Sequence, residues 1–154
     1  MLSPSLEDYL EEIYRLSLSH EAVRVTDIAG KLQVKLPSVT KALRRLNDEN
    51  YLTYRRYKEI ILTDKGRRLG RFLLERNRII QEFIDLLDVA CDKEQEAEAM
   101  EHYLSLPTIR AIDHLVSFMR EHPSWLEAFQ AYRLQKERED LVLEDGYGEE
   151  EPGT

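Results

Sequence analysis

The feature that most constrains the fold of this chain is the run VRVTDIAGKLQVKLPSVTKALRRLNDENYLTYRRYKEIILT, residues 23–63. Apolar residues recur at helical spacing through its first part and bracket a basic tip in its last part. This pattern predicts two short helices followed by two short strands. A helix pair followed directly by a hairpin is typical of a winged helix-turn-helix.

Local signals set the expected boundaries of the two helices. We expect Thr26 to be the N-cap of a short helix over residues 27–32, with a tight turn at Gln33–Val34. Pro37 suits the first turn of a second helix that runs to about Glu49. The second helix would be the recognition helix of the pair, because its polar face is rich in cations.

The recognition helix and wing carry the side chains expected to contact DNA. The strands are predicted over residues 51–54 and 59–63, around a basic tip. Lys and Arg supply phosphate contacts and counterion release, and short polar side chains reach base edges in the major groove. The predicted DNA-binding residues are Lys35, Pro37, Ser38, Thr40, Lys41, Arg44, Arg45, Arg55, Arg56 and Lys58. A winged helix used only for protein contacts is the alternative.

The charge distribution agrees with this interpretation. The whole chain has 22 Lys and Arg against 30 Asp and Glu, yet residues 24–78 alone hold 15 basic against 6 acidic residues. Such asymmetry favours a basic module for a polyanion beside an acidic module with another role. The alternative is that helical surfaces simply carry many charges.

The remaining composition favours a mostly α-helical protein of the cytoplasm. Glycine and proline are scarce, at 6 and 5 residues, and helical periodicity predicts a first helix over residues 5–19. Thr63 or Asp64 should cap a long helix that runs to Leu87. A single cysteine, Cys91, fits a reducing compartment, and neither a signal peptide nor an apolar run of membrane-spanning length is expected.

The stretch EAMEHYLS, residues 98–105, places two carboxylates and an imidazole together. In a helix, Glu98, Glu101 and His102 lie at i, i+3 and i+4 and share one face. Asp8 and Glu11 make a similar pair on the first predicted helix. Taken alone, each group is either a solvated stripe or a set of metal ligands.

Four stretches resemble the diphtheria-toxin-repressor (DtxR) family of metal-dependent repressors, in particular its short manganese-repressor (MntR) branch. They are PSLEDYLEEIY, VTDIAGKLQVKLPSVTKALRRL, YLTYRRYKEIILTDKG and EAMEHYLS, within residues 4–119. The resemblance implies a mostly α fold, with an N-terminal winged helix-turn-helix followed by a helical dimerisation domain. We place the boundaries at 1–70 and 71–143, followed by a disordered acidic tail over 144–154.

The resemblance also implies a metal centre that joins the first, fourth and fifth helices. Carried over by position, its ligands are Asp8, Glu11, Asn77, Glu98, Glu101 and His102. The fourth-helix ligand is a histidine in the best-known members, so Asn77 predicts weaker binding or changed selectivity at one position. The oxygen-rich set favours Mn(II), with Fe(II), Co(II) and Zn(II) as alternatives.

The expected mechanism is activation by metal. Carboxylates about 4 Å apart repel by roughly 4 kcal/mol at an effective dielectric near 20, so the helices that carry them should pack loosely without a cation. The metal-bound protein would repress metal-uptake genes as a homodimer on a pseudo-palindromic double-stranded operator, with no membrane partner. The apolar residues expected in the core or the dimer interface are Leu104, Leu106, Ile109, Ile112, Leu115, Val116 and Met119.

Beyond His122 the resemblance fades. We expect one more amphipathic helix with Trp125, Phe129 and Tyr132 packed inward, and neither the SH3-like domain of longer family members nor the ancillary metal site linked to it.

Two other functions are alternatives. The first is a winged-helix regulator that responds to iron, another divalent metal or a non-metal signal. The second is a di-metal carboxylate enzyme, but such bundles use Glu-x-x-His, and Ala99 stands three residues before His102. We therefore expect no enzymatic activity.

Overall fold

In the computed structural model, residues 2–19, 22–55 and 59–146 are described, with side chains as far as residue 141. Seven helices and two short strands make up this part of the chain, so the prediction of a mostly α fold is confirmed. Within it, no helix is both long and apolar enough to cross a membrane. The elements are α1 (Pro4–Ser19), α2 (Val25–Leu32), α3 (Leu36–Asp48), β1 (Leu52–Thr53), β2 (Ile61–Leu62), α4 (Asp64–Leu87), α5 (Lys93–Glu101), α6 (Leu106–Glu121) and α7 (Pro123–Gly146).

The helix pair α2–α3 has the predicted arrangement but a different start. Helix α2 begins at Val25 and its N-cap is Arg24, so the prediction of Thr26 as N-cap is wrong. The reason is Asp27, whose carboxylate accepts a hydrogen bond from the Arg24 backbone N–H at 3.1 Å. Gln33 ends the helix in the left-handed conformation, with φ 53°, and makes the predicted turn.

The hairpin after α3 is shorter than predicted. Two antiparallel pairs, Leu52 with Leu62 and Thr53 with Ile61, form the ladder. Leu52 and Leu62 face the core while Thr53 and Ile61 face outward, as strand alternation requires. Residues 56–58, which hold most of the predicted basic tip, lie outside the described residues.

The N-terminal half surrounds one apolar core. Leu10 and Ile13 of α1, Leu43 and Leu46 of α3, and Leu73 of α4 are fully buried in it. Helices α1 and α4 approach closely at Gly70, where an added Cβ would lie 2.6 Å from the Cβ of Tyr14. This contact brings the polar face of α1 against the middle of α4.

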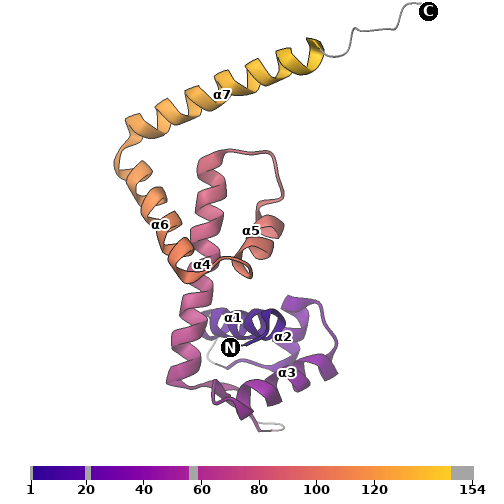
Figure 1. Ribbon diagram of the computed structural model, residues 1–154. Coiled ribbons are helices and arrows are strands. Elements are labelled where there is room, and N and C mark those ends of the chain that lie inside the picture. Colours follow the sequence, from indigo (N-terminus) through magenta and orange to yellow (C-terminus); the bar gives the residue numbers. More distant parts are fainter. Residues whose placement is uncertain (1, 20–21, 56–58, 147–154) are drawn as a thin grey trace, which may run out of the picture.

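Helix α4 continues into a second, smaller core. Ile79, Ile80 and Ile84 pack there with Ala97 of α5 and Ile109 of α6. Figure 1 shows α4 running from the α1–α3 module at the bottom of the view to the α5–α6 part above it. A single continuous helix therefore joins the two halves.

Helix α7 differs from the prediction. Trp125 and Tyr132 are each 60% exposed, so the expectation that they pack inward is wrong. Figure 1 shows α7 running past the far end of α4, where Arg133 donates a hydrogen bond to the Asp88 carbonyl at 2.7 Å, while Trp125 and Tyr132 stay largely outside any core. It also runs to Gly146, so the first residues of the segment predicted to be disordered, 144–146, are helical; residues 147–154 lie outside the described part.

Candidate metal centre and nucleic-acid interface

The outer face of α3 presents exposed cations. Lys35, Lys41, Arg44 and Arg45 are exposed, as are Pro37, Ser38 and, beside the wing, Arg55. Within residues 2–19, 22–55 and 59–146, none of these four α3-face cations forms an ion pair. Such a face is suited to a polyanion.

Two members of the predicted DNA-binding set need separate comment. The Thr40 hydroxyl donates a hydrogen bond to the Leu36 carbonyl at 3.1 Å, which leaves its methyl group and an oxygen lone pair for an outside contact. Arg56 and Lys58 fall outside the described residues, so their predicted role stays a prediction.

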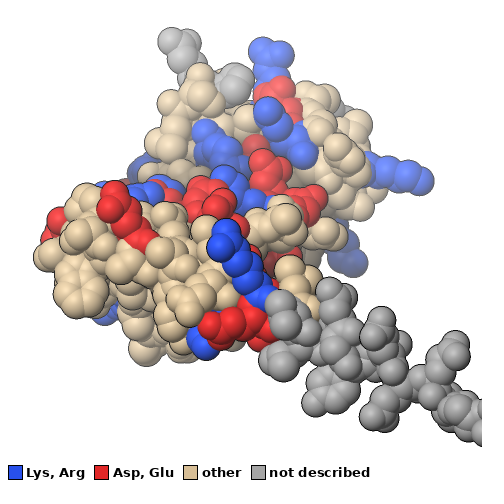
Figure 2. Space-filling view, turned by 90° about the horizontal axis from the view of Figure 1, so that it is seen from above, with Lys and Arg blue, Asp and Glu red and all other residues tan. Residues whose placement is uncertain are grey.

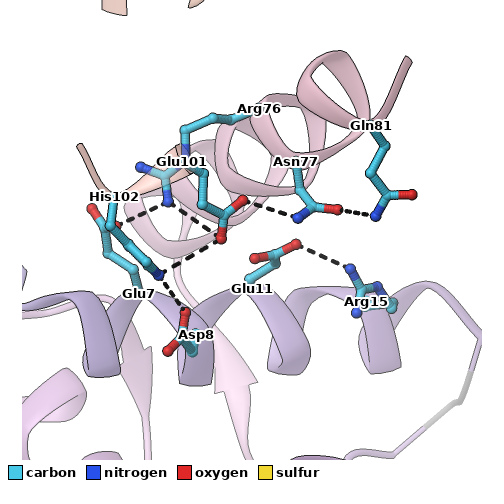
Figure 3. A network of polar contacts seen from close by, with 9 residues as sticks. All are labelled: Glu7, Asp8, Glu11, Arg15, Arg76, Asn77, Gln81, Glu101 and His102. Carbon is cyan, nitrogen blue, oxygen red and sulfur yellow. Dashed lines mark hydrogen bonds and ion pairs between the residues drawn. The ribbon is translucent and has the colours of Figure 1, made fainter. Parts of the chain in front are cut away.

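The other site lies where α1, α4 and the end of α5 meet. Asp8, Glu101 and His102 each offer one ligand atom, and these atoms all lie within 4.8 Å of one another. His102 follows the last residue of α5 but keeps helical backbone angles, φ −80° and ψ −18°, so its ring projects toward α1 together with Glu101. Figure 3 shows these side chains pointing toward one another across the gap between helices.

Distances within this cluster fix how the imidazole is turned. His102 Nε2 lies 3.2 Å from Asp8 Oδ1 and 3.8 Å from Glu101 Oε1. The Glu101 side chain is 2% exposed and that of His102 is 14% exposed, so water solvates them poorly. Two carboxylate oxygens and one imidazole nitrogen thus converge in a buried place.

Asn77 presents its amide nitrogen, not its oxygen, to the cluster. Its Nδ2 donates to Glu101 Oε2 at 3.0 Å, and its Oδ1 accepts from Gln81 Nε2 at 2.8 Å. A carboxylate accepts hydrogen bonds and does not donate them, which explains this orientation. Asn77 therefore positions Glu101 in this structure, and a ligand role would require its amide to turn over.

Glu11 and Glu98 lie beside the cluster. Both line a cavity of about 480 Å³ together with Asp8, Asn77 and Glu101. Glu11 is buried and accepts a hydrogen bond from Arg15 at 3.0 Å. Glu98 is exposed and is not among the three residues whose ligand atoms converge. The structure thus places five of the six predicted ligands around one cavity and gathers three tightly, His102 among them.

Burial leaves the carboxylates of this site with too little compensating charge. Desolvation, reinforced by the nearby Glu101 carboxylate, raises the pKa of Glu11 to about 7. Desolvation also raises the pKa of Asp8 and the pKa of Glu101 above their ordinary values, although His102 and Arg76 respectively act against it. A site that disfavours ionised carboxylates is one in which a cation would be strongly stabilised.

Sequence reasoning missed two residues of this site, Glu7 and Arg76. Arg76 Nη2 lies 3.0 Å from Glu7 Oε2 and 3.8 Å from Glu101 Oε1, and its side chain is only 8% exposed. The sequence prediction assumed that only a metal ion would neutralise these carboxylates, and it did not include this arginine. Helical spacing offered a signal, because Arg76 lies three residues after buried Leu73 and four before buried Ile80.

The donor set fits a divalent cation. Carboxylate oxygens with one imidazole nitrogen are ligands typical of Mn(II) and Fe(II), and the cluster contains no thiolate. Three of its ligand atoms already lie close enough to share one ion.

Figure 2 shows the molecule from the α7 end, with acidic side chains near the middle of the view interleaved with basic ones. Ion pairs form both within and between the helices of the C-terminal half. Glu82 of α4, for example, lies 2.6 Å from Arg78 of the same helix and 3.1 Å from Arg120 of α6. This paired glutamate contrasts with the exposed cations of α3, for which the described residues show no ion pair.

Two family models match consecutive parts of the chain. The model described as "Iron dependent repressor, N-terminal DNA binding domain" matches residues 1–60. The model described as "Iron dependent repressor, metal binding and dimerisation domain" matches residues 63–129. The chain belongs to the iron-dependent repressor family.

Relatives within the family agree with the sequence resemblance. An HTH-type transcriptional regulator MntR from Listeria welshimeri is 39% identical over 137 residues, which covers 88% of this chain and 96% of that protein. The MntR of Geobacillus kaustophilus is 37% identical over 139 residues, which make up 90% of this chain and 99% of that protein.

A solved structure of the manganese regulator SloR has a TM-score of 0.65 at 30% identity. It covers 76% of this chain, and this chain spans about half of it, 55%.

The two family models assign a role to each half of the chain. The α1–α3 module with its hairpin is the DNA-binding domain, and the part from α4 onward is the metal-binding and dimerisation domain. The chain is a metal-dependent transcriptional regulator, as the resemblance implied. The cluster at the junction includes Asp8, which lies in the first matched region, and Glu101 and His102, which lie in the second.

Proposed function

We propose that the protein is a cytoplasmic, Mn(II)-activated repressor that binds a pseudo-palindromic DNA operator as a homodimer. The observation that supports this most is the convergence of Asp8 with Glu101 and His102 within 4.8 Å. One carboxylate comes from the helix that braces the DNA-binding domain, and the other two groups come from the dimerisation domain. A ligand that bridges them would couple the two domains.

Each part of the chain then has a defined task. A bound divalent cation supplies the positive charge that the buried carboxylates lack. Asp8 ties α1 to this centre, and α1 carries Leu10 and Ile13 into the same core as Leu43 and Leu46 of α3. The position of the recognition helix is therefore sensitive to whether α1 is held, and the metal-loaded arrangement is enriched by population shift.

The exposed apolar side chains of the C-terminal half support a dimer. Leu106, Leu115 and Phe118 of α6 are 42–43% exposed, and Trp125 and Leu134 of α7 are 60% and 52% exposed. Large apolar side chains exposed together on neighbouring helices are typical of protein interaction surfaces. A twofold dimer would place two α3 helices about 34 Å apart, one turn of B-DNA.

The experiment is a fluorescence anisotropy titration of a labelled promoter fragment from a metal-uptake gene. Chelated protein is compared with protein given Mn²⁺, Fe²⁺ (anaerobically), Co²⁺ or Zn²⁺. We expect tight binding only with metal and a Mn²⁺ response within its physiological range. His102→Ala should abolish the metal response, while Glu82→Gln, a paired glutamate outside the site, should keep it.

Two results would change the proposal. Activation by Fe²⁺ in preference to Mn²⁺ would favour an iron-responsive regulator. Equal affinity for the promoter with and without every divalent ion would favour a regulator that answers to a non-metal signal.

A further inference from the structure

The Glu7 carboxylate and the Arg76 guanidinium lie next to the cluster of Asp8, Glu101 and His102, although neither belongs to the predicted ligand set. Glu7 Oε2 is 3.3 Å from His102 Nδ1 and 3.0 Å from Arg76 Nη2. Figure 3 shows Glu7 on the side of the His102 ring away from Glu11, with the Arg76 guanidinium between Glu7 and Glu101. Helices α1 and α4 and the end of α5 therefore meet in one polar network.

The direction of the hydrogen bond between Glu7 and His102 follows from Arg76. A carboxylate that pairs with a guanidinium at 3.0 Å is an acceptor, so Nδ1 of His102 carries the proton and donates it to Glu7. The other ring nitrogen, Nε2, is thereby turned toward the Asp8 and Glu101 carboxylates, where a bound cation would take the place of a proton donated to them. A histidine whose second nitrogen is held by a carboxylate is a recurrent arrangement behind protein metal ligands.

Arg76 holds the pair from α4. Its side chain is 8% exposed, and its remaining anionic contact is Glu101 Oε1 at 3.8 Å. Its Nε has no hydrogen-bond partner among the described residues, so the guanidinium depends on Glu7 and Glu101 for its compensation. Arg76 thus fixes two side chains of the site at once, and Asn77 fixes the other oxygen of Glu101.

We propose that Glu7 and Arg76 are positioning residues for the metal centre. Glu7 sets the tautomer and ring orientation of His102, and Arg76 anchors both Glu7 and Glu101. The arrangement presents Nε2 and a Glu101 oxygen toward Asp8 before a cation arrives. This inference rests on the proposed function, since it assumes that the cluster binds a divalent ion.

The test compares Glu7→Gln with the parent protein. Glutamine keeps the size of glutamate but removes the charge that Arg76 and His102 Nδ1 both use. The matched control is Glu82→Gln, because the Glu82 side chain is 20% exposed against 17% for Glu7 and also pairs with arginines, Arg78 and Arg120. Arg76→Lys is a second variant that keeps the positive charge and loses the planar fork.

Two readouts are required. The first is Mn²⁺ affinity from isothermal titration calorimetry, which we expect to fall about 10- to 100-fold in Glu7→Gln, less in Arg76→Lys, and not at all in Glu82→Gln. The second is ¹⁵N NMR of the His102 ring in ¹¹³Cd-loaded protein. The parent should show a protonated Nδ1 and a cadmium-coupled Nε2, and Glu7→Gln should lose the protected Nδ1 proton signal.

Each other outcome has a defined meaning. An unchanged Mn²⁺ affinity in Glu7→Gln overturns the inference. Weaker binding with the His102 ring signals unchanged means that Glu7 only stabilises the fold, which also overturns it. A parent protein that binds neither Mn²⁺ nor Cd²⁺ refutes the proposed function instead.

Discussion

Charged side chains have opposite surroundings on the outer face of α3 and at the junction of α1, α4 and α5. On α3, Lys41, Arg44 and Arg45 are exposed and have no ion-pair partner within the described part of the chain. At the junction, Glu101 and Arg76 are buried and held by several partners. Unpaired surface charge is suited to a long polyanion that attracts at a distance, whereas buried, positioned charge is suited to one small cation.

The comparison predicts that removing a charge costs more folding free energy at the junction than at the surface. Arg76→Met should lower the free energy of unfolding by about 3 kcal/mol or more, because Glu7 and Glu101 would be left buried without compensation. Arg78→Met, two residues along on the exposed face of α4, should lower it by no more than about 1 kcal/mol.

Urea unfolding of the metal-free proteins, followed by circular dichroism, measures both values. Similar small losses in the two variants would contradict the view that the junction is held by its buried arginine.

The junction should also make stability depend on pH. The pKa of Glu11 is about 7 in the folded protein and ordinarily 4.5, so the folded state binds a proton that the unfolded state has released. Its stabilising contribution is complete below about pH 4.5 and is lost as pH rises through about 7. Between about pH 5 and 8 we expect a decline on the order of 2 kcal/mol in metal-free protein.

Urea unfolding at several pH values between about 5 and 8 tests this, with Glu11→Gln as the variant that should lack the decline. Saturating Mn²⁺ should abolish it in the parent protein. A rise in stability of the metal-free parent over the same range would refute the assignment to Glu11.

At the α3 face the expected effect concerns DNA and not stability. Arg44→Ala should weaken operator binding by roughly 1–3 kcal/mol, about 10- to 100-fold, and leave the unfolding free energy unchanged. If Arg44 contacts a phosphate, the slope of log affinity against log salt should also fall by about 1. Anisotropy titrations at several salt concentrations with saturating Mn²⁺ measure both quantities.

The control for Arg44→Ala is Arg120→Ala, which removes an exposed arginine on α6, away from the DNA-binding domain. An equal loss of operator affinity in the two variants would mean that net charge, and not the face of α3, governs binding.

The smallest predicted effect concerns Asn77, the departure from the best-known family members. Replacing it with histidine exchanges an amide donor for an imidazole beside Glu101, so Mn²⁺ affinity should rise several-fold, by about 1 kcal/mol. Asp85→His, two turns further along α4 at an exposed position outside the cavity, is the control and should have no such effect. Calorimetry that shows unchanged affinity in Asn77→His would mean that this position takes no part in metal binding.

Sequence reasoning succeeded where the determinants are local. The recognition helix α3, the turn at Gln33 and the Thr63 cap of α4 follow from periodicity and capping residues that are neighbours in the chain. It also identified Asp8, Glu101 and His102, through a resemblance that carries long-range information. Their convergence across more than 90 residues of sequence is not readable from any one helix.

It failed where the answer depends on distant partners. The inward face of α7 was predicted from Trp125, Phe129 and Tyr132, of which only Phe129 is half-buried. An amphipathic pattern does not say whether a core is available to receive it. Arg76 was set aside because arginine does not coordinate metals. Its place among Glu7, Glu101 and His102 depends on how α1 crosses α4, which the close contact at Gly70 determines.

The most direct test of the whole account is reciprocal linkage between metal and operator. If Asp8, Glu101 and His102 close around a cation to hold the DNA-binding domain, Mn²⁺ must raise operator affinity, and operator DNA must raise Mn²⁺ affinity by the same factor. We predict a factor of about 10 or more in both titrations on the parent protein. Identical operator affinity in chelated and Mn²⁺-saturated protein would contradict the account.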